Sequence, residues 1–213
     1  MMLENQQDQQ ESSHHRNPAD EVDPRTAPGP DWMSMGDVGP RIRTNMVTVY
    51  ILRRPNPDDV TGTQFLQMRR TFSRGSFMNG TWQPVTGGIE PGESAVAAAF
   101  REVEEETGLN RETVMMMWHV DQVRPFYLPS KNLILFPASF AIQVAADWEP
   151  VLNEEHDAVR WIRYDEVNMN FMWRGQRDAI RDIAEDVLAS GPIGSEHLVV
   201  TPEIISRADE AVR

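Results

Sequence analysis

The stretch GGIEPGESAVAAAFREVEEETGL, residues 87–109, decides the fold of this chain. It is rich in alanine and glutamate, which favour an α-helix, and Gly108 stands where such a helix would end. Glu102, Glu105 and Glu106 have the spacing i, i+3 and i+4, so they share one narrow helix face. The apolar side chains project onto a different side, which we expect to be the core face: Val96, Ala99, Phe100 and Val103.

Three neighbouring carboxylates repel each other and lower the stability of their own helix. One interpretation is a solvated, glutamate-rich helix face, which is common in proteins. The other is a site for a hard divalent cation with oxygen ligands, Mg²⁺ or Mn²⁺, which would relieve the repulsion. Ala95 and Ala98 fall on the carboxylate face and leave room beside a metal. Arg101 is placed to hold a carboxylate in position.

The complete spacing favours the metal site. Gly87 is followed after five residues by Glu93, and after seven more by Arg101 and Glu102, continuing as apolar-any-Glu-Glu-any-Gly-apolar. This pattern resembles the signature of the Nudix hydrolases, which hydrolyse a diphosphate linked to another group. The resemblance implies an α+β fold, an α/β/α sandwich with a mixed β-sheet, in which the signature forms a loop–helix–loop catalytic motif.

The resemblance also implies the roles of the site residues. The cofactor is Mg²⁺ or Mn²⁺, and one ligand is a backbone carbonyl in the turn before the helix, here that of Thr86. Many relatives have glycine at this position, so the turn differs here while the carbonyl is retained. Arg101 and Glu93 form the pair that orients the carboxylates. The remaining metal ligands are side chains: Glu102, Glu105, Glu106 and, further along the chain, Glu155.

A thinner resemblance, over about residues 46–185, is to the dihydroneopterin triphosphate pyrophosphatases within the family. It rests on scattered residues, among them Arg69-Arg70, Trp82-Gln83 and Glu155-His156. It implies that Glu155 is an additional metal-binding or catalytic glutamate, with a solvated carboxylate as the alternative. Arg69 and Arg70 are expected to bind outer phosphates or to end a solvated hairpin. Trp82 is expected to stack on a flat heterocycle or to fill the core.

The predicted activity is that of a divalent-metal-dependent pyrophosphohydrolase. It would cleave a nucleoside or pterin triphosphate to the monophosphate and pyrophosphate, with Glu102 ahead of Glu155 as the general base. One alternative is a different diphosphate substrate, such as ADP-ribose, a dinucleoside polyphosphate or a nucleotide sugar. Another is a non-catalytic Nudix module that senses a nucleotide. The complete set of signature carboxylates argues for catalysis.

The composition excludes several other classes of protein. The 33 acidic and 20 basic residues give a formal net charge of −13, so binding to a nucleic-acid duplex or an anionic membrane is not expected. Cysteine is absent, which excludes disulfides, zinc–thiolate sites and cysteine nucleophiles. No apolar stretch is long enough to cross a bilayer, and no secretory signal is readable. We expect a cytoplasmic protein with a small-molecule phosphoanhydride substrate, and a homodimer is left open.

The chain divides into a disordered acidic, proline-rich tail (1–43), a Nudix domain (44–190) and a C-terminal extension (191–213). Alternating apolar residues predict strands, and a 3.6-residue period predicts helices. The expected strands are 46–54, 63–70, a short strand within 81–88 that leads into a turn at Gly87-Gly88, two long apolar strands (114–126 and 133–144), and 158–163. The expected helices are the signature helix, 178–189, and a short final helix, 202–212, of no readable role.

Overall fold

The computed structural model describes residues 39–72, 78–121, 123–189 and 195–212. The elements given below belong to one unit, Pro40–Arg213. The predicted tail lies outside the described residues up to position 38, and its last residues, Arg41–Arg43, form the short strand β1. No helix within the described ranges is long and apolar enough to cross a membrane.

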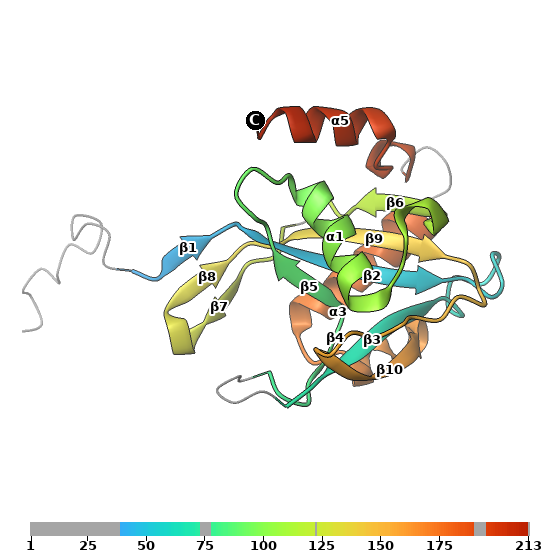
Figure 1. The fold of residues 1–213 in the computed structure, drawn as a ribbon. Coiled ribbons are helices and arrows are strands. Elements are labelled where there is room, and N and C mark those ends of the chain that lie inside the picture. The colour runs from blue at the N-terminus through green and yellow to red at the C-terminus, as the bar shows by residue number, and fades with distance from the viewer. Residues whose placement is uncertain (1–38, 73–77, 122, 190–194, 213) are drawn as a thin grey trace, which may run out of the picture. The chain divides into compact units, whose positions relative to one another are not determined.

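Strand β2 (Met46–Arg53) lies in the middle of a mixed seven-stranded sheet of order β10–β3–β2–β9–β6 (Figure 1). It runs parallel to β9 and antiparallel to β3 and β5, while the short β4 pairs with β3. The strands have these bounds: β3 (Gln64–Arg70), β4 (Trp82–Gln83), β5 (Val85–Gly88), β6 (Met116–His119), β9 (Ala138–Val144) and β10 (His156–Arg163).

Helices cover both faces of this sheet, as the predicted α/β/α sandwich requires. β2 contributes alternate residues to two cores, because successive side chains of a strand point to opposite faces. Val47, Val49 and Ile51 pack in the core beneath α1 (Ala95–Thr107). Tyr50 and Leu52 pack in the core beneath α3 (Arg174–Asp182) and the π-helical segment that follows it, Ile183–Ala189.

Helix α1 ends at Gly108, as the sequence predicts, and begins at Ala95, two residues after the predicted start at Glu93. The side chain of Ser94 caps its start by accepting a hydrogen bond from the Ala97 N–H at 3.1 Å. Gly108 ends it in the left-handed conformation, with φ of 67°, and donates its N–H to the Glu104 carbonyl. Val103 and two neighbouring apolar positions are buried on the core face, as predicted: Val96 and Ala99.

The predicted long strand at 133–144 is wrong, because the chain changes sheet at Pro137. Its first part, β8 (Leu133–Leu135), pairs with β1 and with β7 (Phe126–Leu128) in a separate three-stranded sheet. Its second part, β9, belongs to the main sheet. Proline has no N–H to donate to a sheet ladder, so it stands at the break. The predicted strand 114–126 is likewise limited to β6 in its first half.

The C-terminal part differs from the prediction in the start of one helix. The helix predicted at 178–189 starts earlier, at Arg174, after a short helix α2 (Val167–Asn170). The final predicted helix is present as α5 (Pro202–Glu210), and it packs against α1. The main chain at Val200 donates to the Met117 carbonyl at 2.8 Å, which attaches the segment before α5 to β6.

Candidate active site

Strand β5 brings a glycine directly against the signature helix. Gly87 lies opposite Val47 in the β5–β2 pair. A Cβ atom at Gly87 would overlap the carboxyl group of Glu102. The absence of a side chain therefore allows this glutamate to lie against the strand. The side chain of Glu102 is only 14% exposed as a result.

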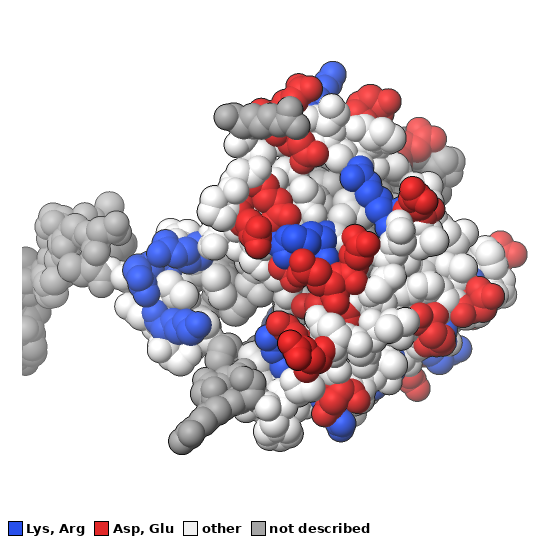
Figure 2. Space-filling model, in the orientation of Figure 1, with Lys and Arg blue, Asp and Glu red and all other residues white. Residues whose placement is uncertain are grey.

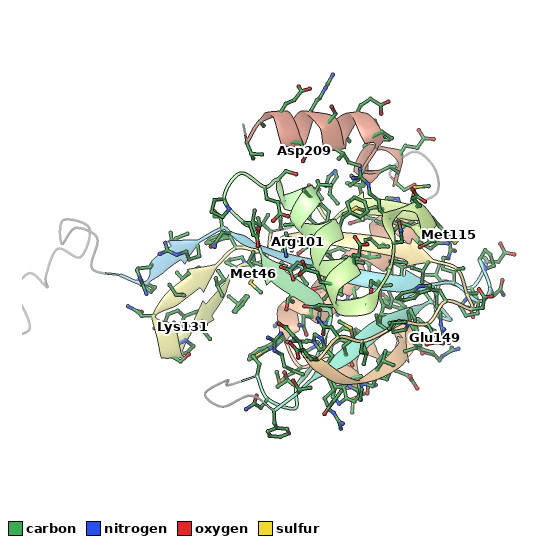
Figure 3. The ribbon with its side chains drawn as sticks, viewed as in Figure 1. Met46, Arg101, Met115, Lys131, Glu149 and Asp209 are labelled. Atoms are coloured by element: carbon green, nitrogen blue, oxygen red, sulfur yellow. The ribbon has the colours of Figure 1, made fainter. Side chains whose placement is uncertain are left out.

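Arg101 lies in the middle of the carboxylates, which surround it on one face of the molecule (Figures 2 and 3). Its guanidinium donates to both oxygens of Glu93 at 3.0 Å and to Oε1 of Glu102 at 2.8 Å. It also donates to Glu105 at 3.3 Å and to the Gly88 carbonyl at 2.8 Å. Hydrogen bonds from this cation hold the pKa of Glu93 below its usual value. One arginine thus joins the turn, the helix and the strand.

The register of β5 directs two of its carbonyls toward the carboxylates. The Ile89 N–H donates to the Asn45 carbonyl, so hydrogen-bonded pairs alternate along β5 and β2 from that point. Thr86 and Gly88 fall at the positions that face away from β2. Consistently, the Gly88 carbonyl accepts from Arg101, and the Thr86 backbone hydrogen-bonds the carboxylate of Glu106. Since N–H and C=O of one strand residue point the same way, the Thr86 carbonyl lies on this edge.

Glu106 is the most deeply buried carboxylate of the site. Its residue is 2% exposed, and its Oε2 atom has no hydrogen-bond partner. Burial raises the pKa of Glu106 to about 9, with smaller contributions from the charges of Glu102 and Glu155. Burial also raises the pKa of Glu102, opposed by the hydrogen bond from Arg101. An isolated carboxylate in this position needs a cation or a proton.

Glu155 reaches the same region from the segment before β10. Its side chain forms an ion pair of 3.0 Å with Arg70, at the end of β3. Its carbonyl accepts from the Thr71 N–H at 2.8 Å, which ties the two segments together. The charges of Glu155 and Arg70 both act on Glu106. The fold therefore gathers the predicted Glu155 and Arg70 beside the helix carboxylates.

The donor atoms fit Mg²⁺ or Mn²⁺. The groups are carboxylates and a backbone carbonyl, which are the ligands of hard cations, and Glu106 has an oxygen left without a partner. Within the described part of the chain, no three acidic or histidine side chains are close enough together to form a ready-made metal centre. Two of the carboxylates, Glu102 and Glu105, are instead turned to Arg101.

The structure does not bring Arg69 and Trp82 to this cluster. Arg69 follows the strand alternation to the other face of the sheet, where it pairs with Asp157 at 2.7 Å. Trp82 lies opposite Arg69 in the β3–β4 pair, and the guanidinium of Arg160 stands over its ring, 4.2 Å from the ring centroid. Arg160 also donates to Oε1 of the buried Gln67 at 2.9 Å. This second polar group is separate from the carboxylates.

Sequence reasoning missed two features of the carboxylate side. The first is the Gly88 carbonyl, which accepts from Arg101 and which the strand alternation around the glycine pair could have indicated. The second is the contact between Gln83 and His156, which the family resemblance names only separately; both are buried, and their side-chain nitrogens lie 3.4 Å apart, near the charges of Arg70 and Glu155. Burial lowers the pKa of His156, so its ring is neutral near pH 7. No spacing in the sequence links residues 83 and 156.

Comparison with known proteins identifies the family. The model of the NUDIX domain matches residues 43–183, and the chain belongs to this family. The octanoyltransferase of Myxococcus xanthus is 31% identical over 149 residues, which are 68% of this chain and 37% of that protein. The RNA pyrophosphohydrolase of Haemophilus ducreyi is 30% identical over 104 residues, 41% of this chain and 52% of that protein.

A solved structure supports the fold alone. The dihydroneopterin triphosphate pyrophosphohydrolase of E. coli has a TM-score of 0.54 and 21% sequence identity, over 70% of this chain and 99% of that one. The chain spans between about a third and about a half of the length of the curated relatives given above. Their names describe different reactions, so the substrate has to be argued from the site.

Proposed function

We propose that this chain is a divalent-metal-dependent hydrolase of phosphoanhydrides that cleaves a nucleoside or pterin triphosphate to the monophosphate and pyrophosphate. The observation that carries the proposal is Glu106, a buried carboxylate with an unpartnered oxygen, close enough to Glu102 and Glu155 for their charges to raise its pKa. Burying a carboxylate beside other carboxylates lowers the stability of the fold. Such groups with shifted pKa values are typical of functional sites.

The ligands proposed for Mg²⁺ or Mn²⁺ are the carboxylates of the cluster and one carbonyl: Glu102, Glu105, Glu106, Glu155 and that of Thr86. When bound, the cation supplies charge neutralisation of the diphosphate and acidifies the attacking water. Arg101, held by Glu93, keeps the carboxylates in position through its hydrogen bonds. Arg101 must give up part of its contact with Glu102 or Glu105 for these oxygens to bind the cation.

Glu102 is our candidate for the general base, and Glu155 for the additional ligand. Burial raises the pKa of Glu102, which brings it closer to the range in which a base is effective near neutral pH. One of its oxygens, Oε1, accepts from Arg101 at 2.8 Å, and we assign to the other the proton of the attacking water. Glu155 is paired with Arg70 and its charge acts on Glu106, which supports its assignment as a ligand beside the helix carboxylates.

The triphosphate assignment depends on Arg70. This arginine adds a positive charge beside the carboxylates that an outer phosphate can use. The proposed contacts of Arg69 and Trp82 with the substrate require a rearrangement of side chains. Arg69 is paired with Asp157, and Arg160 lies over the ring of Trp82, both on the opposite face of the sheet. The heterocycle of the substrate would have to displace Arg160 to stack on Trp82.

A substrate panel tests the function. Purified protein with Mg²⁺ should release pyrophosphate from dihydroneopterin triphosphate or a deoxynucleoside triphosphate, with kcat/KM at least about tenfold above that for ADP-ribose or a dinucleoside polyphosphate. EDTA should abolish turnover, and Mg²⁺ or Mn²⁺ should restore it. A dinucleotide as the best substrate would overturn the triphosphate assignment. Binding of Mn²⁺ and nucleotide without turnover of any panel member would identify a sensor instead.

A further inference from the structure

The C-terminal helix α5 makes a specific contact with the start of the signature helix. Ile205 and Ala208 of α5 pack against the core that α1 also covers (Figure 1). The segment before α5 is attached to β6 by the bridge between Val199 and Trp118. Asp209 lies on the side of α5 next to α1 (Figure 3). α5 is thus held beside α1 by packing on the shared core and by the attachment of the preceding segment to β6.

The contact is a hydrogen bond that completes the cap of α1. Ser94 Oγ donates to Oδ1 of Asp209 at 2.6 Å, while the same oxygen accepts from the Ala97 N–H at 3.1 Å. Ser94 is 4% exposed, so water has little access to replace Asp209. Donation to a carboxylate also orients the hydroxyl so that its lone pairs face the helix N–H groups.

Asp209 also supplies a charge that α1 lacks. The first turn of α1 contains no acidic side chain, although a negative charge stabilises the N-terminal end of a helix. Glu93, which precedes the cap, has both its oxygens bonded to Arg101 and one of them also to the Glu90 N–H. The carboxylate next to the capping serine therefore comes from α5, more than a hundred residues later in the chain.

The cap is directly connected to the carboxylate cluster. Ser94 follows Glu93, and Glu93 holds Arg101 through two hydrogen bonds. Arg101 in turn contacts Glu102 and Glu105. A shift of Ser94 moves the backbone of Glu93 and so the guanidinium that orders these two carboxylates.

We propose that Asp209 is a positioning residue for the metal-binding carboxylates, acting through Ser94 and Glu93, and that α5 is part of the catalytic unit. The inference rests on the proposed function, since it assigns a role toward the same cluster. It gives the final helix, which has no readable role in the sequence, a defined one. It also implies that the part of the chain needed for full metal affinity extends beyond the predicted domain (44–190) into the C-terminal extension.

The experiment measures Mn²⁺ binding by electron paramagnetic resonance, together with thermal unfolding, in full-length variants. Asp209→Ala removes the acceptor, and Asp209→Asn keeps an acceptor oxygen without the charge. Glu210→Ala is the matched control, because it removes the same charge from the neighbouring, exposed position on α5. We expect Asp209→Ala to weaken Mn²⁺ binding by about three- to tenfold, somewhat less than loss of a direct partner of a ligand.

The variants separate positioning from general stabilisation. Asp209→Asn should recover most of the Mn²⁺ affinity, and Glu210→Ala should bind as the wild type does. In the hydrolysis assay, Asp209→Ala should raise the Mg²⁺ concentration for half-maximal rate more than it lowers kcat at saturating Mg²⁺. A lower melting temperature with unchanged Mn²⁺ affinity would overturn the inference. Wild-type protein that does not bind Mn²⁺ at all would instead overturn the proposed function.

Discussion

The two faces of strand β3 place neighbouring arginines in opposite environments. On the α1 side, Arg70 meets Glu155 near the buried Glu106, where carboxylates outnumber cations and one oxygen lacks a partner. On the α3 side, Arg69 is paired with Asp157, and Arg160 is bonded to Gln67. The carboxylates of the first face include one without a full set of partners, whereas the arginines Arg69 and Arg160 of the second face have partners within the protein.

This difference teaches where a ligand is needed. Polar groups that find partners inside the protein gain little from a ligand, whereas an unpaired buried carboxylate gains much from a cation. The carboxylate face is therefore the part of the molecule that metal and phosphates should complete. The arginine pair in the sequence does not act as one unit, because the strand alternation separates its members.

The largest expected effect follows from neutralising the buried carboxylate. Glu106→Gln should lower kcat with Mg²⁺ by on the order of 100-fold or more, since it removes the charge of a proposed metal ligand. The metal-free protein should keep or gain thermal stability, because burial of the charge is costly. Glu104→Gln, an exposed neighbour on the same helix, is the control and should stay near the wild-type rate. An unfolded Glu106→Gln variant, or one with full activity, would contradict the assignment.

A smaller effect should distinguish the two arginines. Arg70→Ala should raise KM for the triphosphate by about tenfold, because it removes a charge beside the carboxylates. Arg69→Ala makes the same change in charge on the other face and should alter KM by about threefold or less. Steady-state kinetics with one triphosphate at saturating Mg²⁺ decides the matter. Equal effects of the two substitutions would show that both arginines reach the substrate.

The smallest effect is a pH dependence of stability in the absence of metal. The pKa of Glu106 in the fold, about 9, lies above its ordinary value of 4.5. Between these values the folded chain binds more protons than the unfolded chain, so the contribution of Glu106 to the free energy of unfolding falls as pH rises. Urea unfolding in EDTA should show this slope in the wild type and a flatter one in Glu106→Gln. Parallel slopes for both proteins would argue against the burial of this charge.

The local parts of the fold were predictable from the sequence. The end of α1 follows from Gly108, and its core face from the spacing of Val96, Ala99 and Val103, because capping and periodicity act within a few residues. The strands between residues 114 and 144 were harder to predict from the sequence. Their apolar runs do not say where a strand leaves one sheet for another, which Pro137 marks only once the pairing is known.

The candidate site was also predictable only as far as local spacing and the family resemblance reach. The i, i+3, i+4 spacing places Glu102, Glu105 and Glu106 together, and the family resemblance adds Glu155 and Thr86. It does not distinguish Glu105, whose side chain is 56% exposed, from the buried Glu106. Which carboxylate is removed from water depends on the strand that packs over it. The spacing of residues along the helix does not show where that strand lies.

The sequence by itself determined the family, the signature helix and the face of that helix on which carboxylates gather, since these depend on local spacing. The tertiary structure alone decided that Glu106 is buried without a full set of partners, that Glu155 lies beside it in an ion pair with Arg70, and that Asp209, more than a hundred residues away in the chain, accepts a hydrogen bond from the capping Ser94. The physical reason is that desolvation and long-range hydrogen bonds depend on which distant segments pack together. Local residue patterns carry no information on that packing.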